Sequence, residues 1–456
     1  MAVRAFACAA VPERKKTMSF ESLNLDAILK RAVADAGYTE ATEVQQRAIP
    51  LALQGVDLTD SSNTGSGKTA AFVLPALQRV LAARAAAEQQ RGGPRAPAGP
   101  RVLVLTPTRE LAMQVAKATM DYGRHVRGLR VCTVVGGVPY GLQLKQLRGP
   151  LDVLIATPGR LIDHLGAGKA DLSHVELLVL DEADRMLDMG FIDDIQHIAA
   201  NLPQGRQTMM FSATFAGATG RLAEELLRNP QRVSVDSHTD SHAGIEQRLH
   251  WADDMAHKNA LLEHILADRA VDQAVVFTST QRDADSLADR LAEMGHRVAS
   301  LHGGMPQGRR TRVLQGLRHR DLRVLVATDV AARGIDVPTI SHVINYGLPM
   351  KAEDYVHRIG RTGRAGRQGL AVTLAERRDF GMVQRIQRFT TQRIPSTTIE
   401  GLEPKRGEPA GERPTKPGFG ARKPGFGPRP GSRPGGRPGA PAGRGGFAPK
   451  AGFRPR

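Results

Sequence analysis

The sequence is poor in cysteine, in aromatic residues and in long hydrophobic runs. Two cysteines among 456 residues, Cys8 and Cys132, exclude a disulfide-stabilised scaffold and suit a reducing cytosol. No uninterrupted apolar run approaches the length of a membrane-spanning helix, so we expect no membrane partner. Acidic residues are also few, because 46 Asp and Glu stand against 63 Lys and Arg, for a formal net charge of +17. This charge favours a polyanionic partner, most simply nucleic acid, although a basic surface can also serve solubility alone.

Hydrophobic residues make up 41% of the chain, which is enough to build the cores of two or three domains at this length. Apolar runs such as "RVLVLT", "DVLIAT" and "QTMMFSAT" alternate with helical stretches up to about residue 235. The alternation restarts near residue 247 with "QAVVFTST" and "LRVLVATD". Short apolar runs separated by helices are typical of parallel sheets in βαβ units. The sequence therefore predicts two α/β domains with a cleft between them.

Three segments differ in composition from these blocks. Residues 1–17 precede a capped amphipathic helix near Asp26, and we interpret them as a misannotated or disordered extension, with a short targeting segment as the alternative. Residues 84–100 are expected to form a surface loop of the first domain. Residues 403–456 hold 13 Lys and Arg against three Glu, interleaved with phenylalanines. We predict a disordered tail that binds RNA through stacking and charge, with an inert solubilising tail as the alternative.

A phosphate-binding pattern lies in the stretch "DSSNTGSGKT", residues 60–69. Gly65 and Gly67 allow backbone N–H groups to point inward. Lys68 is placed to reach the β and γ phosphates, and the Thr69 hydroxyl is placed to bind Mg²⁺. The apolar run that follows predicts a helix whose positive end faces the phosphates. On its own the pattern is moderately specific, and a chance loop is the alternative.

An acidic pair supports the phosphate-binding interpretation. The apolar run "VELLVL" ends in Asp181 and Glu182. A carboxylate at the end of a buried strand is suited to hold Mg²⁺ beside a phosphate loop, and the next one can polarise an attacking water. The alternative is that the two acidic residues simply begin a helix. The strand that precedes them and Lys68 upstream make this alternative less convincing.

Further motifs follow one another from residue 20 to about residue 388: "GYTEATEVQQRAIP", "TPTRELAMQ", "ATPGRL", "VLDEADRMLDMGF", "FSAT", "LHGGMPQGRR", "VATDVAARGID" and "HRIGRTGRAG". In this order they resemble the DEAD-box family of ATP-dependent RNA helicases. The opening "MSFESLNL" and the short basic tail are most similar to the bacterial RhlE type. The resemblance implies two RecA-like parallel-sheet domains in tandem, with ATP and Mg²⁺ as cofactors. It also implies non-processive unwinding of short RNA duplexes in the cytoplasm, in ribosome assembly or RNA turnover.

The resemblance sets the expected segments. They are the extension 1–17, the Q motif region 18–46, the ATP-binding domain 47–237, the linker 238–246, the C-terminal helicase domain 247–398 and the tail 399–456.

The same motifs imply a role for individual residues. The nucleotide would be held by Phe20, Tyr38, Gln45, Ser62, Asn63, Thr64, Gly65, Ser66, Gly67, Lys68, Thr69 and Asp336. Catalysis would use Lys68, Asp181, Glu182 and two arginine fingers, Arg361 and Arg364, while Thr69 and Asp181 would hold the metal. Coupling between ATP and RNA would use Asp184, Ser212, Thr214 and His357. The RNA backbone would be contacted by Thr108, Arg109, Gly137, Thr157, Gly159, Arg160, Thr278, Gln307, Arg310 and Thr328.

The sequence departs from the family pattern at two places. Asp60 stands where a small or apolar residue is usual, and Ser62 where alanine is usual. We favour an Asp60 that reaches solvent or a basic partner, with a weakened or pH-sensitive ATPase as the alternative, because burial raises a carboxyl pKa. Ala41 and Glu43 replace two prolines, which predicts a looser turn before Gln45 and weaker nucleotide affinity with adenine preference retained.

Two other functions compete with the helicase hypothesis. An RNA chaperone or ATP-dependent clamp with weakened hydrolysis would show little ATP turnover. A DNA helicase is disfavoured by "DEAD" together with the Q motif.

Overall fold

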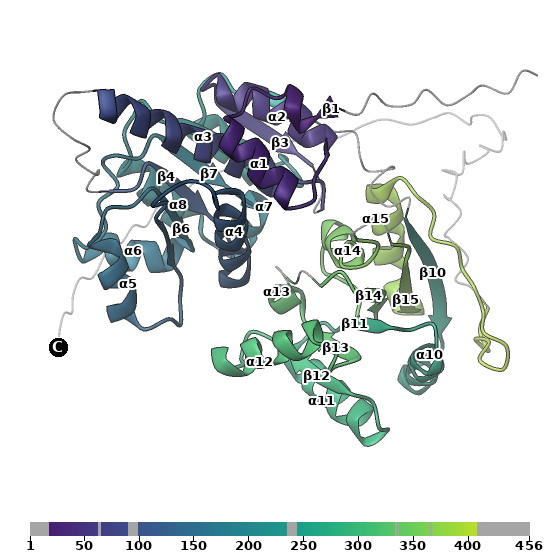
Figure 1. Ribbon diagram of the computed structural model, residues 1–456. Helices are drawn as coiled ribbons and strands as arrows, with labels where there is room; N and C mark the ends of the chain where they lie inside the picture. Colours follow the sequence, from purple (N-terminus) through teal and green to yellow (C-terminus); the bar gives the residue numbers. More distant parts are fainter. Residues whose placement is uncertain are drawn as a thin grey trace, which may run out of the picture. The chain divides into compact units, whose positions relative to one another are not determined.

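The computed structural model describes residues 18–62, 65–89, 99–234, 244–332, 335, 337–364 and 367–407. These residues form two separate parallel sheets and one antiparallel pair of short strands, β1 (Met18–Ser19) and β2 (Glu40–Ala41) (Figure 1). The predicted fold class of two parallel-sheet α/β domains is confirmed. The extension 1–17 and the tail beyond residue 407 lie outside the described residues.

The first domain is built on a seven-stranded sheet with the order β5-β6-β4-β7-β8-β3-β9, in which every pair is parallel. Its strands are β3 (Leu58–Ser61), β4 (Val102–Leu105), β5 (Val131–Val134), β6 (Val153–Ala156), β7 (Leu177–Leu180), β8 (Gln207–Ser212) and β9 (Gln231–Ser234). The central strands are almost uniformly apolar because a parallel sheet is covered on both faces.

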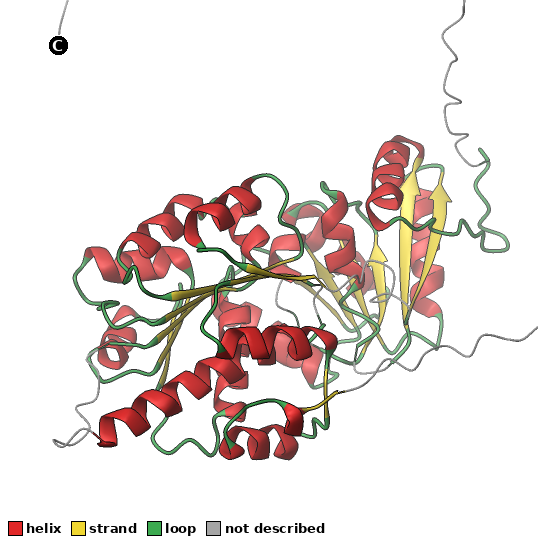
Figure 2. Ribbon diagram, turned by 90° about the horizontal axis from the view of Figure 1, so that it is seen from above, coloured by secondary structure: helices red, strands yellow, loops and turns green. Residues whose placement is uncertain are grey.

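Helices cover both faces of this sheet (Figure 2). One face packs against α1 (Ala27–Asp35), α2 (Glu43–Leu53), α3 (Lys68–Gln89) and α4 (Arg109–Tyr122). The other packs against α5 (Tyr140–Leu147), α6 (Pro158–Gly166), α7 (Ala183–Asp188), α8 (Ile192–Ala200) and α9 (Ala218–Leu226). Val179 belongs to the first core and its neighbour Leu180 to the second, as the alternation of strand side chains requires.

The second domain is built on a six-stranded parallel sheet with the order β10-β15-β14-β11-β13-β12. Its strands are β10 (Ile245–Ala252), β11 (Gln273–Phe277), β12 (Val298–Leu301), β13 (Val324–Ala327), β14 (Ile340–Asn345) and β15 (Gly369–Glu376). Its helices are α10 (Met255–Ala267), α11 (Gln281–Glu293), α12 (Gln307–Arg318), α13 (Asp329–Ala332), α14 (Ala352–Ile359) and α15 (Phe380–Thr390). Two short 3₁₀ turns, η1 (Phe20–Ser22) and η2 (Arg377–Asp379), complete the described elements.

Helix α3 differs from the sequence prediction in two respects. It continues to Gln89, so the expected loop 84–100 is wrong for residues 84–89, where alanines favour helix; residues 90–98 lie outside the described part. By length and composition alone, α3 is also apolar enough to cross a membrane. Its residues 70–77 are buried in the core of the first domain, which accounts for this composition and makes it weak evidence for a span.

Candidate functional site

The loop between β3 and α3 has the backbone shape that a phosphate requires. Gly65 and Gly67 have φ angles of 89° and 92°, in the region that favours glycine. A Cβ atom on Gly67 would lie 2.5 Å from Nε2 of Gln45, so a larger residue would collide with that side chain. Helix α3 begins at Lys68, and its first N–H groups therefore face the loop. This cradle fits the phosphates of a nucleotide; Asn63 and Thr64 of the predicted set lie outside the described residues.

Lys68 is buried at the start of α3. Its Nζ donates a hydrogen bond of 2.9 Å to the carbonyl oxygen of Ser62. Its charge also opposes the effect of burial on two carboxyl groups, Asp60 and Asp181. The cation is therefore held between the loop and the acidic residues at the ends of the strands.

Asp60 is completely buried in β3, between β8 and β9. Ser62 Oγ donates a hydrogen bond of 3.1 Å to its Oδ2, while its Oδ1 has no hydrogen-bond partner. Burial raises the pKa of Asp60 to about 6, against the lowering effects of Lys68 and of the Ser62 hydroxyl. The expectation that Asp60 reaches solvent is wrong, because its side chain lies in an inner strand of a sheet that helices cover on both faces.

The acidic pair lies at the carboxyl end of β7. Asp181 is 3% exposed, and burial raises its pKa to about 7 although Lys68 acts in the opposite direction. Glu182 has a left-handed backbone with φ of 52°, a strained conformation for a non-glycine residue, and it precedes α7. Thr69 lies in the first turn of α3. A carboxylate and a hydroxyl are oxygen donors of the kind that Mg²⁺ prefers, so Asp181 and Thr69 fit the predicted metal role.

The Q motif is tied to the phosphate loop by hydrogen bonds. Gln45 Nε2 donates to the carbonyl oxygen of Gly67 at 3.0 Å, and Thr42 Oγ1 donates to that of Ser66 at 2.7 Å. Thr42 and Gln45 also form a capping box at the start of α2. This box holds the turn without the two prolines. The spacing Thr-x-x-Gln was the sequence signal for it, which the analysis of the Q motif missed.

The two aromatic residues predicted at the nucleotide lie in different environments. Phe20 is 5% exposed and packs into the core of the first domain. Tyr38 is 52% exposed, and its ring centroid lies 6.3 Å from that of Tyr122. Tyr38 is thus the more accessible ring in this structure. Asp336, also predicted to hold the nucleotide, lies outside the described residues.

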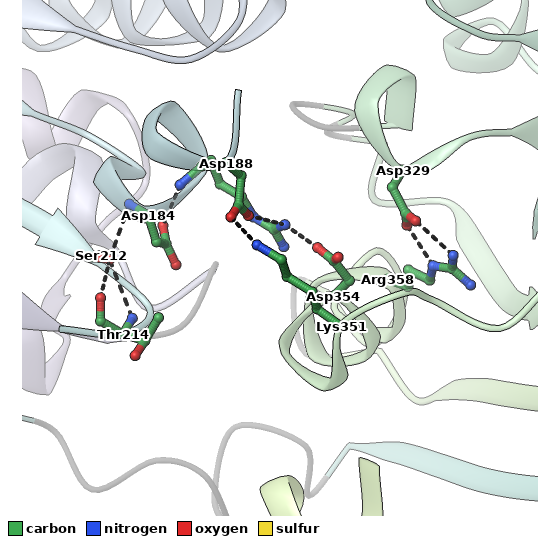
Figure 3. Close-up of polar contacts among 9 residues, drawn as sticks. Asp184, Asp188, Ser212, Thr214, Asp329, Lys351, Asp354 and Arg358 are labelled. Carbon is green, nitrogen blue, oxygen red and sulfur yellow. Dashed lines mark hydrogen bonds and ion pairs between the residues drawn. The ribbon is translucent and has the colours of Figure 1, made fainter. Parts of the chain in front are cut away.

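The two predicted arginine fingers converge on one carbonyl group of the second domain. Arg361 Nη1 and Arg364 Nη1 donate to the carbonyl oxygen of Ile335 at 3.0 and 3.4 Å. A neighbouring arginine, Arg358, was not singled out from the sequence. It is buried and binds both carboxylate oxygens of Asp329, at 2.6 and 2.7 Å (Figure 3), which anchors α14 to α13.

The predicted coupling residues of the first domain lie together after β7 and β8 (Figure 3). The backbone N–H of Asp184 donates to Ser212 Oγ at 3.3 Å, and Ser212 Oγ donates to the carbonyl oxygen of Thr214 at 2.7 Å. His357 lines a small hollow that Arg361 also lines.

Ion pairs join the two domains, and one of them lines this hollow. Arg185 forms a buried ion pair with Asp354, and Lys351 pairs with Asp188 (Figure 3). Arg185 and Asp354 also line the hollow. Sequence reasoning missed both pairs, because their partners lie 169 and 163 residues apart in the chain.

The first-domain residues predicted to bind RNA follow three neighbouring strands. Thr108 and Arg109 follow β4, Gly137 follows β5, and the third group, Thr157, Gly159 and Arg160, follows β6. A Cβ atom on Gly137 would overlap the guanidinium of Arg109, so the two residues are in contact. Burial lowers the pKa of Arg109, and the nearby cations Arg310 and Arg160 lower it further. This edge therefore concentrates positive charge.

The second-domain residues of the predicted RNA set lie on β11, β13 and α12. Thr278 and Thr328 directly follow β11 and β13, which are neighbours in the sheet. Arg310 Nε and Nη2 donate to Glu110 Oε1 at 3.2 and 3.0 Å, and Gln307 Nε2 approaches the same oxygen at 3.5 Å. Glu110 of the first domain, which was not predicted as a site residue, therefore contacts two second-domain residues of the predicted RNA set.

Comparison with known proteins identifies the family. Residues 42–221 match the DEAD/DEAH box helicase family and residues 257–366 match the helicase conserved C-terminal domain. The chain is 42% identical to the ATP-dependent RNA helicase SrmB of Escherichia coli strain K12, over 86% of each chain. The chain belongs to the DEAD-box family of ATP-dependent RNA helicases.

Other relatives extend this assignment. The helicase is 42% identical to the ATP-dependent RNA helicase DeaD of Escherichia coli strain K12, over 84% of its own length and 59% of that relative. Its structure is similar to that of S. cerevisiae Dbp5 bound to RNA and ADP BeF3, with a TM-score of 0.74 and 30% identity. That similarity covers 84% of this helicase and 95% of the other chain.

Proposed function

We propose that this DEAD-box helicase couples RNA-stimulated ATP hydrolysis to local, non-processive unwinding of short RNA duplexes. The observation that carries the proposal is the common edge of the first sheet. The phosphate loop follows β3, the acidic pair follows β7, and the first-domain residues of the predicted RNA set follow β4, β5 and β6. All strands of this sheet are parallel, so these groups share its carboxyl edge, where open α/β sheets bind their ligands.

The first-domain residues have distinct tasks in the ATP reaction. Lys68 holds the negative charge of the β and γ phosphates, and Glu182 orients and polarises the attacking water. Mg²⁺, when held by Asp181 and Thr69, neutralises charge on the phosphate oxygens. Arg361 and Arg364 supply further positive charge from the second domain. The reaction then depends on how the two domains approach each other.

The RNA residues of both domains are suited to the sugar-phosphate backbone. They are hydroxyls, glycine amides and arginines, which recognise backbone without reading bases. ATP and RNA together would close the domains around one bent strand, and a duplex cannot follow that bend, so its strands separate locally. In this proposal, Arg310 exchanges its contact with Glu110 for a phosphate of the RNA.

The proposed cellular role is based on resemblance to one type within the family. The opening residues and the basic tail favour the RhlE type, and with it ribosome assembly or RNA turnover in the cytoplasm. A strand-displacement assay on RNA duplexes of increasing length tests the unwinding mode. Non-processive separation predicts a rate that falls steeply with duplex length, whereas processive tracking would give rates nearly independent of it.

One specific observation favours a second function. The fully buried carboxyl of Asp60 lies beside the phosphate loop, where a negative charge would oppose phosphate binding. An ATP-dependent RNA clamp or chaperone with weakened hydrolysis would fit such a site. Tight RNA binding with negligible ATP turnover in the full-length protein would favour this second function.

Replacing Gln45 by alanine should reduce the preference for ATP over GTP. A glutamine side chain that reads adenine through paired hydrogen bonds discriminates by about 1–3 kcal/mol, or roughly fivefold to 150-fold. The ratio of kcat/KM for the two nucleotides measures the effect. Gln46→Ala is the matched control, because Gln46 lies in the same helix and its Nε2 donates to the carbonyl oxygen of Ala41. An unchanged ratio in Gln45→Ala would exclude adenine reading by this residue.

Removing most of the positive charge of the tail should weaken RNA binding. Residues 408–456 hold eight arginines, and replacing all of them by glutamine keeps the length of the tail. We expect Kd for single-stranded RNA to rise about tenfold or more and its dependence on salt to become shallower, because fewer counterions are released. Titrations at several salt concentrations measure both quantities. An unchanged salt slope would favour the solubilising role of the tail.

A further inference from the structure

Two residues at the entrance to the phosphate loop depart together from the family pattern. Asp60 stands where a small or apolar residue is usual in the family, and Ser62 stands where alanine is usual. The structure joins them directly, because Ser62 Oγ donates to Asp60 Oδ2 at 3.1 Å and both side chains are buried. The serine therefore supplies a hydrogen bond to a carboxylate that would otherwise have none on either oxygen.

The pair continues into the loop as a chain of hydroxyl groups. Ser66 Oγ donates to Ser62 Oγ at 3.1 Å, and Lys68 Nζ donates to the carbonyl oxygen of Ser62 at 2.9 Å. Thr42 Oγ1 holds the carbonyl oxygen of Ser66 from the Q motif, at 2.7 Å. Ser62 is thus the point where the strand, the loop and the catalytic lysine meet.

We propose that Asp60 and Ser62 act as one positioning unit, which sets the phosphate loop and makes nucleotide affinity depend on pH. This inference rests on the nucleotide site of the proposed function. It adds a dependence of nucleotide affinity on pH that the usual family residues at these positions would not give. Ser62 alone can accept the Ser66 hydrogen bond, but the Asp60 carboxyl fixes the direction in which its hydroxyl hydrogen points. Loss of either side chain therefore changes the conformation of the phosphate loop. Loss of both side chains leaves at positions 60 and 62 small residues like those usual in the family.

Few charges act on Asp60 from the elements around it. The neighbouring strands present Phe211 of β8 and Val233 of β9 at its register, and Arg232 of β9 is exposed. Helix α3 contributes Lys68, whose charge lowers the Asp60 pKa. On α2, Arg47 is exposed and pairs with Glu43. Lys68 is therefore the cation that Asp60 shares with the phosphates.

This sharing sets the direction of the pH dependence. Burial raises the pKa of Asp60 to about 6, so the group changes charge near neutral pH. The negative charge of bound phosphates raises that pKa further, because like charges disfavour ionisation. By linkage, nucleotide affinity is highest with Asp60 neutral and falls as the pH rises through about 6.

The test uses full-length protein carrying Ser62→Ala, Asp60→Ala, both of these changes together, or Asp60→Asn. We would measure Kd for a fluorescent ADP analogue with Mg²⁺, and KM and kcat for ATP, across the pH range from mildly acidic to mildly basic. Ser62→Ala should raise Kd about fivefold at neutral pH, the effect of one hydrogen bond. The double variant should bind more tightly than Ser62→Ala alone. Asp60→Asn should remove the part of the pH dependence that exceeds the titration of the nucleotide itself.

Ser61→Ala is the matched control, because Ser61 lies between the pair on β3 and its Oγ donates to Ser234 Oγ at 3.4 Å instead. The control should bind as the parent does. The proposal is overturned if Asp60→Asn keeps the pH profile of the parent, or if the effects of the two single changes simply add. If the parent protein binds no ADP analogue, the proposed nucleotide site itself is overturned. If the parent binds the analogue and the variants bind it equally well, only the proposal about Asp60 and Ser62 is overturned.

Discussion

Replacing Arg361 by alanine should lower ATP turnover by about a thousandfold or more at saturating ATP and RNA. An arginine finger stabilises charge that develops on the transferred phosphoryl group, and such a residue contributes roughly 10³–10⁵ in rate. Arg361→Lys should rescue little, because the ammonium lacks the planar, forked donor geometry of the guanidinium. Binding of an ADP analogue should change far less than turnover, because the phosphate loop belongs to the first domain. Single-turnover hydrolysis and equilibrium titration separate the two effects.

A structural role for Arg361 needs its own control. Its guanidinium binds the carbonyl oxygens of His357 and Ile335 at 3.1 and 3.0 Å, so the alanine variant also loses hydrogen bonds. Arg367→Ala removes an exposed arginine near the same motif and should keep parental turnover. Thermal unfolding would report any loss of the second domain. A folded Arg361→Ala protein with turnover near that of the parent would contradict the finger role.

Replacing Asp60 by asparagine should change how stability depends on pH. The pKa of this carboxyl rises from 3.8 to about 6 on folding, because burial disfavours the charged form. A raised folded pKa contributes stability that is fully present below pH 3.8 and is lost as the pH rises through about 6. The full loss corresponds to about 3 kcal/mol. About 2 kcal/mol of it falls between pH 4.5 and pH 7.5.

Denaturant unfolding of parent and Asp60→Asn across that range measures the effect. The free energy of unfolding of the parent should fall by about 2 kcal/mol more than that of the variant as the pH rises. Comparing the difference between the two proteins cancels the other titrating groups. Parallel curves would mean that Asp60 keeps its ordinary pKa in the folded protein. A confirmed difference would mean that the helicase retains a destabilising carboxyl at its phosphate loop.

The fold was predictable because its signals are local. Runs such as "LLVL" of β7 and "VLVA" of β13 are four-residue strands buried on both faces, and they read as continuous apolar segments. Glycine at positions 65 and 67 likewise marked the loop through backbone conformation. The Asp26 cap of α1 was also predicted, and its side chain accepts from the backbone of Ile28. Each of these features depends on a few adjacent residues.

The parts that sequence did not predict depend on contacts between distant residues. Glu110 and Arg310 lie 200 residues apart in the sequence, and Arg185 and Asp354 lie 169 residues apart. No local sequence pattern predicts either ion pair. The environment of Asp60 was misjudged for a related reason. A carboxylate in a strand was expected to reach solvent or a basic partner, but helices on both faces of the sheet bury the Asp60 side chain. Its partner Ser62 lies only two residues away in the sequence. The hydrogen bond from the Ser62 hydroxyl to Asp60 could still not be predicted, because it depends on the three-dimensional direction of both side chains.

Steady-state ATP hydrolysis with and without single-stranded RNA tests the proposed function most directly. The full-length protein should hydrolyse ATP slowly alone and much faster with RNA, and Lys68→Ala should abolish both rates. RNA binding by the Lys68→Ala variant provides the control for folding. Tight RNA binding by the parent without ATP hydrolysis would contradict the helicase function and favour a clamp or chaperone, with Asp60 the first residue to replace.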